Sequence, residues 1–290
     1  MKRELALSVI FISLFSSNIY AYDMNNMCEE LLKKGDNKKA VIASKRVANK
    51  YDSSFCAAKA HYRMKNFESA VASFDESIGV ADLPVDQLYS FLYKGIAQRD
   101  LEDFKASSAT FTKGLNTAAL GNSKYMQMEQ RFLYQLGQNE LANENGLEAI
   151  DYFSKSLTLA ANDDERGDSF EGLSLAYYVS NKLDSAIEYG VKASTTFQRT
   201  GKLNEYAEMQ IKMANYESIQ KNYIRALRIL NSLEDFAKKN GGRYFEAKAL
   251  LEKSLIFTKQ GHVDDATQSF KKGQAIAIEI GAQDLLPPKQ

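Results

Sequence analysis

Small and bulky apolar residues recur along the chain at helical spacing. In "LEAIDYFSKSL" (147–157), a small residue is followed four positions later by an aromatic residue and three positions after that by another small one. Similar arrangements return in "SAVASFDESI" (69–78) and "DATQSFKKGQAI" (265–276). Spacings of three and four place such residues on one face of a helix. The pattern therefore predicts a series of amphipathic helices.

The small residues also occur in pairs that are twelve positions apart. This spacing fits two short antiparallel helices joined by a tight turn, in which a small residue on each helix allows close approach. A large residue four positions after the second member would fill the gap beside them, as at Phe74, Phe111, Phe153, Leu230 and Phe270. The seven pairs are Cys28/Ala40, Ala58/Ala70, Gly95/Ser107, Gly137/Ala149, Ser174/Ala186, Ala214/Ala226 and Ser254/Ala266.

Turn signals lie between the two predicted helices of a pair. Each places Gly or Asn just before the second helix, where the first helix needs a left-handed residue and the next helix needs a cap. We therefore expect tight turns in five stretches: "KKGDNKKA" (33–40), "RMKNFESA" (63–70), "VSNKLDSA" (179–186), "IQKNYIRA" (219–226) and "TKQGHVDDA" (258–266).

The pairs repeat with a period near forty residues. Their second members stand at positions 40, 70, 107, 149, 186, 226 and 266. One such pair could belong to an ordinary helical bundle, but seven with the same internal offset favour a repeat array. A period near forty with two helices per unit predicts an α-solenoid.

One stretch resembles a known repeat family. The segment "RFLYQLGQNELANENGLEAIDYFSKSLTLA" (131–160) is similar to a tetratricopeptide repeat, with Leu136, Gly137, Ala149 and Phe153 in that pattern. The usual period of that family is about 34 residues, so the longer units here resemble its variant with lengthened helices, which occurs in signalling and regulatory proteins. The resemblance implies an all-α, right-handed solenoid of about seven helix-turn-helix repeats over residues 22–282, with a loose tail at 283–290.

The N-terminus is predicted to be a secretory signal peptide over residues 1–21. A basic start is followed by an apolar run from Leu5 to Phe15 and a more polar approach to Ala21. A membrane anchor needs about 20 apolar residues, which is longer than this run. We expect cleavage after Ala21 and export, with the bacterial periplasm preferred because no Asn-x-Ser/Thr acceptor occurs. Release to the medium is the alternative.

Export changes the interpretation of the two cysteines. Cys28 and Cys56 are the only cysteines, and an even pair in an oxidising compartment predicts one disulfide. A zinc site is the weaker interpretation because the two histidines, His61 and His262, are far apart in sequence. The separation of the cysteines also differs from that of a Cys-x-x-Cys redox motif.

Composition and motifs argue against two functional classes. Lys plus Arg and Asp plus Glu number 37 each, so no net field favours nucleic acid. No phosphate loop, His-Glu-x-x-His or Gly-x-Ser-x-Gly motif occurs. The carboxylates of "ANDDERGD" (161–168) fit a solvated link better than an acid/base pair. We therefore expect no enzyme and no cofactor.

A solenoid of helix pairs exposes a concave groove lined by its first helices. The leading interpretation is therefore an exported scaffold that binds a peptide segment or an envelope protein. A periplasmic sensor that captures a small molecule or signal peptide and signals to a membrane receptor is the alternative. The sequence does not decide between the concave and convex faces, and oligomeric state is left open.

The groove residues follow from the 3.6-residue period. Positions three before, one after and four after each small residue of a first helix should face the concave side. Packing against neighbouring helices is the competing explanation for each of them. We expect Tyr62, Arg99, Tyr134 and Tyr178 to carry recognition. The full set is Phe55, Lys59, Tyr62, Leu92, Ile96, Arg99, Tyr134, Gln138, Leu141, Glu171, Leu175, Tyr178, Ile211, Asn215 and Ser218.

Overall fold

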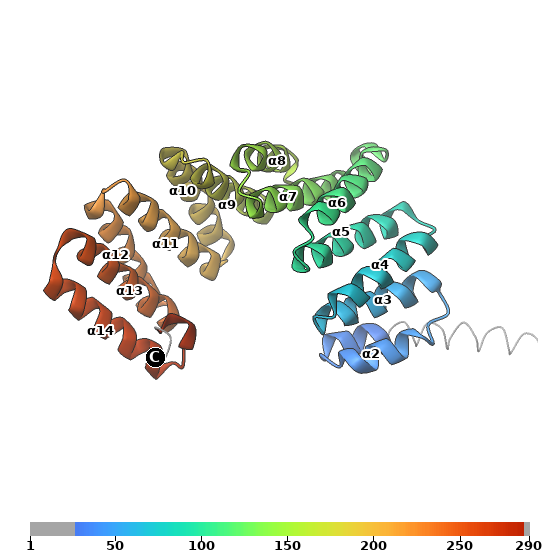
Figure 1. The fold of residues 1–290 in the computed structure, drawn as a ribbon, viewed down its shortest axis with the longest axis horizontal. Coiled ribbons are helices and arrows are strands. Elements are labelled where there is room, and N and C mark those ends of the chain that lie inside the picture. The colour runs from blue at the N-terminus through green and yellow to red at the C-terminus, as the bar shows by residue number, and fades with distance from the viewer. Residues whose placement is uncertain (1–26, 287–290) are drawn as a thin grey trace, which may run out of the picture. The chain divides into compact units, whose positions relative to one another are not determined.

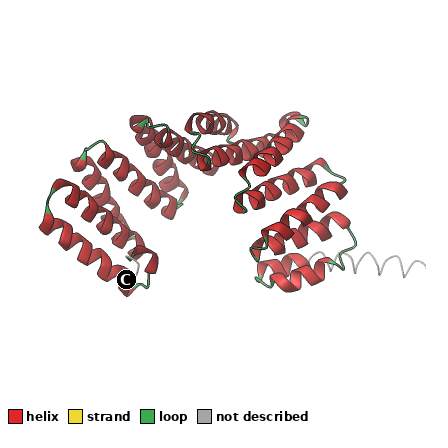
Figure 2. Cartoon of the chain, viewed as in Figure 1, coloured by secondary structure: helices red, strands yellow, loops and turns green. Residues whose placement is uncertain are grey.

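The computed structural model describes residues 27–286, and the regular elements in that range are α-helices and two 3-10 turns (Figures 1 and 2). The fold prediction of an all-α solenoid is confirmed for this part of the chain. The predicted signal peptide (1–21) and residues 287–290 lie outside the described residues.

The chain divides into two compact units between Asn143 and Glu144, and each unit is described by itself. In the first unit, residues 27–33 are helical. The elements that follow are α2 (Asn37–Ser44), α3 (Lys50–Arg63), α4 (Phe67–Val80), α5 (Pro84–Asp100), α6 (Phe104–Ala119), the 3-10 turn η1 (Asn122–Tyr125) and α7 (Met126–Ala142).

The second unit begins with α8 and has longer, more uniform helices. Its elements are α8 (Gly146–Leu159), α9 (Asp163–Val179), α10 (Leu183–Thr200), α11 (Leu203–Ile219), α12 (Tyr223–Lys239), α13 (Arg243–Gln260), α14 (Val263–Glu279) and the 3-10 turn η2 (Gln283–Leu285). From α2 to α7 in one unit and from α8 to α14 in the other, each helix packs against the next one along the chain. We call α3, α5, α7, α9, α11 and α13 the first helices.

The small residues lie where paired helices meet, as predicted. The hydroxyl of Ser107 on α6 donates to the carbonyl of Gly95 on α5 at 2.8 Å. Ser174 on α9 donates in the same way to Ala186 on α10 at 2.7 Å. A Cβ added to Gly95 would overlap the ring of Phe111, so the small residue and the bulky one fit together across the pair.

The bulky residues behave as predicted except at the end of the second unit. Phe74, Phe111, Phe153 and Leu230 are all fully buried. Phe270 was expected to fill the same place, but it is 39% exposed. The reason is that α14 packs only on α13 and η2 within the described chain, so no further helix covers the ring.

The predicted turns form, but two of them use a different residue. Gly35, Asn181 and Gly261 adopt the left-handed conformation as expected. In the turns 63–70 and 219–226 the left-handed residue is lysine, Lys65 and Lys221, with φ of 60° and 63°. The asparagine follows one position later, at the start of the next helix, and makes no side-chain cap in either turn. These turns therefore need a left-handed residue at a fixed position after the helix end, and a residue other than Gly or Asn can take that conformation there.

The predicted disulfide between Cys28 and Cys56 is present, with a Cα–Cα distance of 6.6 Å. It joins the helical residues 27–33 to α3. Both cysteines are buried in a small cluster with Leu32, Ala40 and Ala60. The disulfide closes a loop of the chain and so adds to the stability that the small core at this end provides.

Two glycines in the first unit allow a matched test of helix packing. Gly95→Ala should destabilise the protein by about 1–3 kcal/mol, because the added methyl group overlaps the buried ring of Phe111. Gly79→Ala in α4 meets no atom within 4 Å. It should stabilise by up to about 1 kcal/mol, through helix propensity alone.

Urea unfolding followed by far-ultraviolet circular dichroism measures both changes. Equal effects of the two substitutions would contradict the close approach of α5 and α6.

Candidate functional site

The first helices of the first unit carry a stripe of side chains at helical spacing. On α5 the stripe is Val85, Tyr89, Leu92, Ile96 and Arg99, with steps of four and three that keep its members on one face. The equivalent stripe on α7 is Gln127, Arg131, Tyr134, Gln138 and Leu141. We call these two stripes, with Phe55, Lys59 and Tyr62 on α3, the first-helix face.

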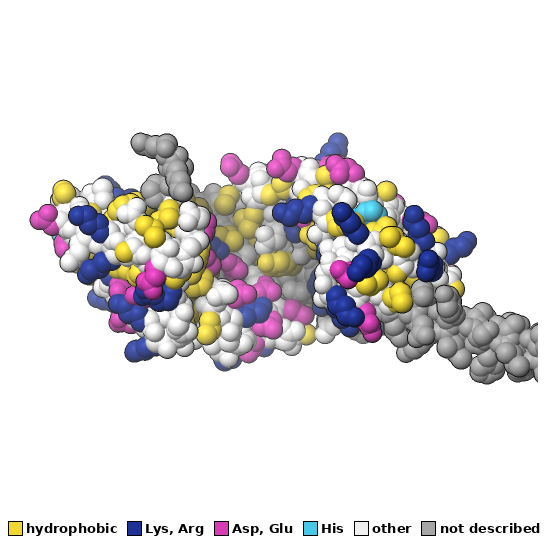
Figure 3. Space-filling view, turned by 90° about the horizontal axis from the view of Figure 1, so that it is seen from below, with side chains coloured by type: hydrophobic (Ala, Val, Ile, Leu, Met, Phe, Trp, Pro, Cys, Tyr) yellow, Lys and Arg dark blue, Asp and Glu magenta, His cyan; other side chains and the backbone are white. Residues whose placement is uncertain are grey.

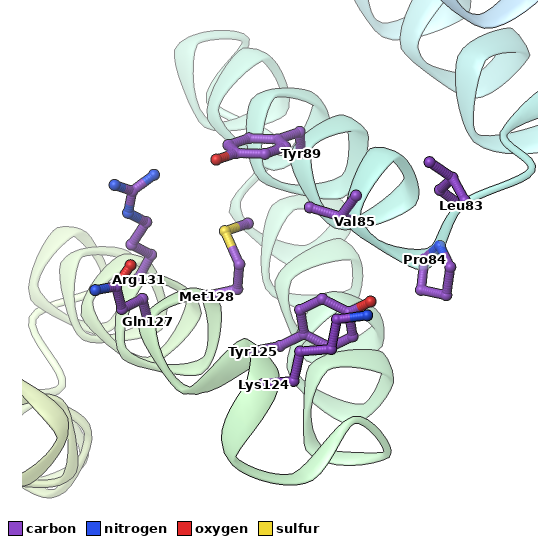
Figure 4. A pocket seen from close by; sticks show the side chains of 9 residues that line it. All are labelled: Leu83, Pro84, Val85, Tyr89, Lys124, Tyr125, Gln127, Met128 and Arg131. Carbon is purple, nitrogen blue, oxygen red and sulfur yellow. The ribbon is translucent and has the colours of Figure 1, made fainter.

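A pocket of 360 Å³ opens at the N-terminal part of this face (Figure 4). It lies between the beginning of α5, the beginning of α7 and the turn η1. This pocket was not predicted, because the predicted groove residues extend only one turn on either side of each small residue. Continuing the same stripes two turns toward the N-terminus would have found it. The lining residues are Leu83, Pro84, Val85, Tyr89, Lys124, Tyr125, Gln127, Met128 and Arg131.

The two sides of the pocket differ in chemistry. Leu83, Pro84 and Val85 form an apolar side at the start of α5, and the ring of Tyr89 lies above them (Figure 4). The rest of the lining comes from η1 and α7, where Lys124 lies beside Tyr125 and Arg131 lies on the other side of Met128 (Figure 4).

The two cations of the pocket have no carboxylate beside them. The ammonium of Lys124 lies 5.2 Å from the centre of the Tyr125 ring. No acidic side chain lines the pocket, and neither Lys124 nor Arg131 has an ion-pair partner within residues 27–286. The pocket therefore presents positive charge next to an apolar surface.

Three of the four residues expected to carry recognition meet in the first unit. The Tyr62 hydroxyl donates to the Asp100 carboxylate at 2.6 Å, and Gln138 Nε2 donates to the Tyr134 hydroxyl at 2.9 Å. Burial, reinforced by the bond to Asp100, raises the pKa of Tyr62 to about 12. Arg99 lies near enough to Asp100, Tyr134 and Tyr62 for their charges to act on its guanidinium.

Arg99 is more buried than its expected role implies. Burial lowers the pKa of its guanidinium, although Asp100 and the tyrosines act in the opposite direction. Its Nη1 is buried and has no hydrogen-bond partner in the described chain. A cation in this setting favours an anionic or polar group close by.

Phe55 and Lys59 on α3 are engaged within the unit itself. Phe55 stacks on Tyr51 at 5.3 Å and meets Phe74 edge-on at 5.7 Å. Lys59 forms an ion pair with Glu29, with its ammonium 5.1 Å from the Phe55 ring. Both side chains remain half-buried, so packing accounts for most of their surface.

Ion pairs join successive first helices in the second unit. Glu171 on α9 pairs with Lys212 on α11 at 2.5 Å, and Glu208 on α11 pairs with Lys248 on α13 at 2.7 Å. Glu171 was expected to face a ligand, but its carboxylate is already paired. Leu175 is half-buried. Tyr178, 42% exposed, stacks on Tyr216 at 4.7 Å.

Three predicted groove residues are buried, which is a correction. Leu92 is 7% exposed, Ile211 is 4% exposed and Ser218 is 3% exposed. Ile211 belongs to the core cluster formed by α11, α12 and α13. A first helix inside a unit is covered by neighbouring helices on both sides. Fewer of its side chains are therefore exposed to solvent than the helical period alone implies.

Asn215 and Glu252 form a polar contact between α11 and α13. The Asn215 side chain lies close enough to the Glu252 carboxylate to favour its charged form. Burial raises the pKa of Glu252, and this outweighs the opposing effects of Asn215, Lys248 and Lys259. Asn215 was predicted to face the groove, and the structure places it in this contact.

No group of three or more His, Cys, Asp or Glu side chains in residues 27–286 is arranged to hold a metal ion. Within the same range no helix is both long and apolar enough to cross a membrane. Acidic, basic and apolar side chains are interspersed over the face drawn in Figure 3, in keeping with the balance of 37 acidic and 37 basic residues.

Comparison with known proteins identifies the fold. No family model matches the sequence, and the search of curated proteins finds no match either. Solved structures do match. A signal transduction ATPase with numerous domains from Pyrococcus horikoshii, described as having a tetratricopeptide repeat sensor, gives a TM-score of 0.72 at 15% identity over 91% of this chain and 43% of that one.

Two further structures cover most of both chains. RapI in its apo form gives a TM-score of 0.69 at 12% identity, over 89% of this chain and 77% of that chain. Aspartyl phosphate phosphatase F from Bacillus subtilis gives 0.62 at 15% identity, over 94% and 74%. This chain has a tetratricopeptide-type repeat fold. At these identities the likeness establishes the tetratricopeptide-type fold and leaves the ligand to be argued from the site.

Glu252→Gln tests the buried carboxylate. Because the folded pKa is raised, the folded state binds this proton more tightly than the unfolded state, so wild-type stability falls as pH rises through that range. The amide carries no charge, so we expect Glu252→Gln to be more stable than wild type at neutral pH. The advantage should shrink as pH falls through the raised folded pKa and should be gone below the pKa of an ordinary glutamate, about 4.3.

Urea unfolding of both proteins from acidic to neutral pH measures the difference. A difference that does not change with pH would show that Glu252 is not held in a buried environment.

Proposed function

We propose that the chain is a peptide-binding module and that the peptide lies on the first-helix face of the unit 27–143. The observation that carries this proposal is the pocket between α5 and α7. It opens N-terminal to the residues of α5 and α7 that the helical period had selected as a groove, and it combines aromatic, apolar and basic side chains.

The size of the site supports a peptide ligand. Pockets for ligands occupy about 300–1,000 Å³, and this one has 360 Å³. The α5 stripe continues beyond it from Val85 to Arg99, which is about 21 Å at 1.5 Å per residue. An extended peptide of about six residues spans that length. Tyr62, Tyr89 and Tyr134 offer large contact areas at low entropic cost.

The likeness to repeat proteins supports interaction in general rather than any one ligand. Tetratricopeptide-type units stack into extended surfaces that suit the capture of other chains. One similar structure is described as having a repeat sensor, which agrees with a binding role. We therefore propose a scaffold for a peptide segment of another protein, an envelope protein if the chain is exported.

A sensory role is the second candidate. The pocket volume also fits a small molecule, and capture of a small molecule or signal peptide could be passed to a membrane receptor. A melting temperature that rises with the low-molecular-weight fraction of the culture, and not with peptides, would favour the sensor.

Export is part of the proposal and has its own test. We expect the chain expressed in a Gram-negative bacterium to appear in the periplasmic fraction without residues 1–21. Intact-mass measurement should place the new N-terminus at Tyr22. Recovery from the cytoplasm with Met1 retained would contradict export.

Peptide binding can be tested without knowing the partner. A random peptide library displayed on phage is selected against the purified protein, and enriched peptides are titrated by fluorescence polarisation. Tyr89→Ala combined with Tyr134→Ala should weaken their binding at least tenfold, about 1.4 kcal/mol. Both side chains lie on the first-helix face, and aromatic anchors carry much of the energy of such interfaces.

Tyr152→Ala is the control, because Tyr152 lies on α8 in the other unit. It should leave the affinity unchanged. If no peptide is enriched, or if the folded double variant binds as well as wild type, the proposed function is wrong.

A further inference from the structure

We infer that the pocket between α5 and α7 selects an acidic peptide segment, in which a bulky apolar side chain enters the pocket and a neighbouring Asp or Glu pairs with Lys124 or Arg131. This inference rests on the proposed function and names the chemistry of its ligand. It follows from the unequal sides of the pocket and from the charge around it.

The apolar side determines what enters the pocket. Leu83 is 58% exposed and Tyr89 is 37% exposed, whereas Met128 at the back is 6% exposed. Exposed leucine and tyrosine above a buried methionine leave an apolar surface that water covers poorly. A phenylalanine, leucine or similar side chain would remove that surface from water.

The basic side determines what lies next to it. Lys124 on η1 and Arg131 on α7 lie apart in the pocket lining, on either side of Met128 in the view of Figure 4. A peptide that places its apolar side chain in the pocket therefore brings its neighbouring residues toward one cation or the other. A carboxylate beside either cation can accept a hydrogen bond from it.

Two cations on first helices of the other unit are paired with carboxylates. Lys212 on α11 and Lys248 on α13 each have such a partner, at 2.5 and 2.7 Å respectively. Lys124 and Arg131 have none within the described residues. Because the whole chain has no net charge, this positive charge is local and can select a ligand by complementarity.

A peptide is favoured over a small anionic molecule by what surrounds the pocket. Beyond the pocket the stripes continue with half-buried side chains, at Ile96 on α5 and at Tyr134 and Gln138 on α7. Only a ligand that extends beyond the pocket would use them. The ligand therefore carries its apolar and acidic residues as parts of a longer chain.

A charge-reversal experiment tests the inference. The phage library is selected in parallel against wild type, the variant Lys124→Glu with Arg131→Glu, and a control variant with Lys105→Glu and Lys113→Glu. The control makes the same change in net charge on α6, at two exposed side chains. Circular dichroism melts check that all three proteins are folded.

We expect wild type and the control to enrich peptides with Asp or Glu beside an aromatic or large aliphatic residue. The pocket variant should lose those peptides and enrich Lys or Arg at the same place. An individual acidic peptide should bind the pocket variant at least about tenfold more weakly than wild type.

The outcomes separate the inference from the proposed function. Enriched peptides with no acidic preference, or with a preference that the pocket variant retains, overturn the inference. If such peptides still depend on Tyr89 and Tyr134, the proposed function stands. A small anionic molecule that alone occupies the pocket, with no peptide enriched, overturns both.

Discussion

The close approach of paired helices is the constraint on which the rest of the structure depends. A methyl group at Gly95 would overlap Phe111, and the hydroxyls of Ser107 and Ser174 reach the backbone of the facing helix directly. Helices that meet at their backbones must have small residues at the contact and a large one beside it. This requirement produces the spacing of twelve positions between the paired small residues. The other faces of each helix are left to contact the neighbouring repeats or solvent.

Those remaining faces differ between the units. In the first, the face of α5 and α7 is aromatic, apolar and basic, and it opens into a pocket. In the second, acidic and basic side chains on successive first helices neutralise one another, as Glu171 and Lys212 do. The pairs that span α9, α11 and α13 are partly exposed and contribute modestly to stability. The cations of the pocket in the first unit, in contrast, have no carboxylate partner in the described residues.

The sequence was sufficient for the fold because close packing leaves a periodic trace. It predicted the helix pairs, the disulfide between Cys28 and Cys56 and most of the buried rings. It failed where the outcome depends on what lies beside a helix. Phe270 has the pattern of a buried ring but no following helix, and Ile211 has the pattern of a groove residue but is covered from both sides. Helical period gives the direction of a side chain, and only the tertiary arrangement determines what it meets. The pocket was missed because the stripe that contains it was followed for too few turns.

The spacing of the turns governs which changes in chain length the fold tolerates. From residue 181 to residue 281 the left-handed residues recur every twenty positions, at 181, 201, 221, 241, 261 and 281. One residue inserted within such a helix would rotate everything after it by about 100° and turn the small residue away from its partner. Between α6 and α7 the chain is less regular and forms the extra turn η1. Insertions and deletions can accumulate there without disturbing the helix pairs, and since Lys124 and Tyr125 belong to this link, ligand preference can diverge among descendants of this chain while the scaffold stays the same.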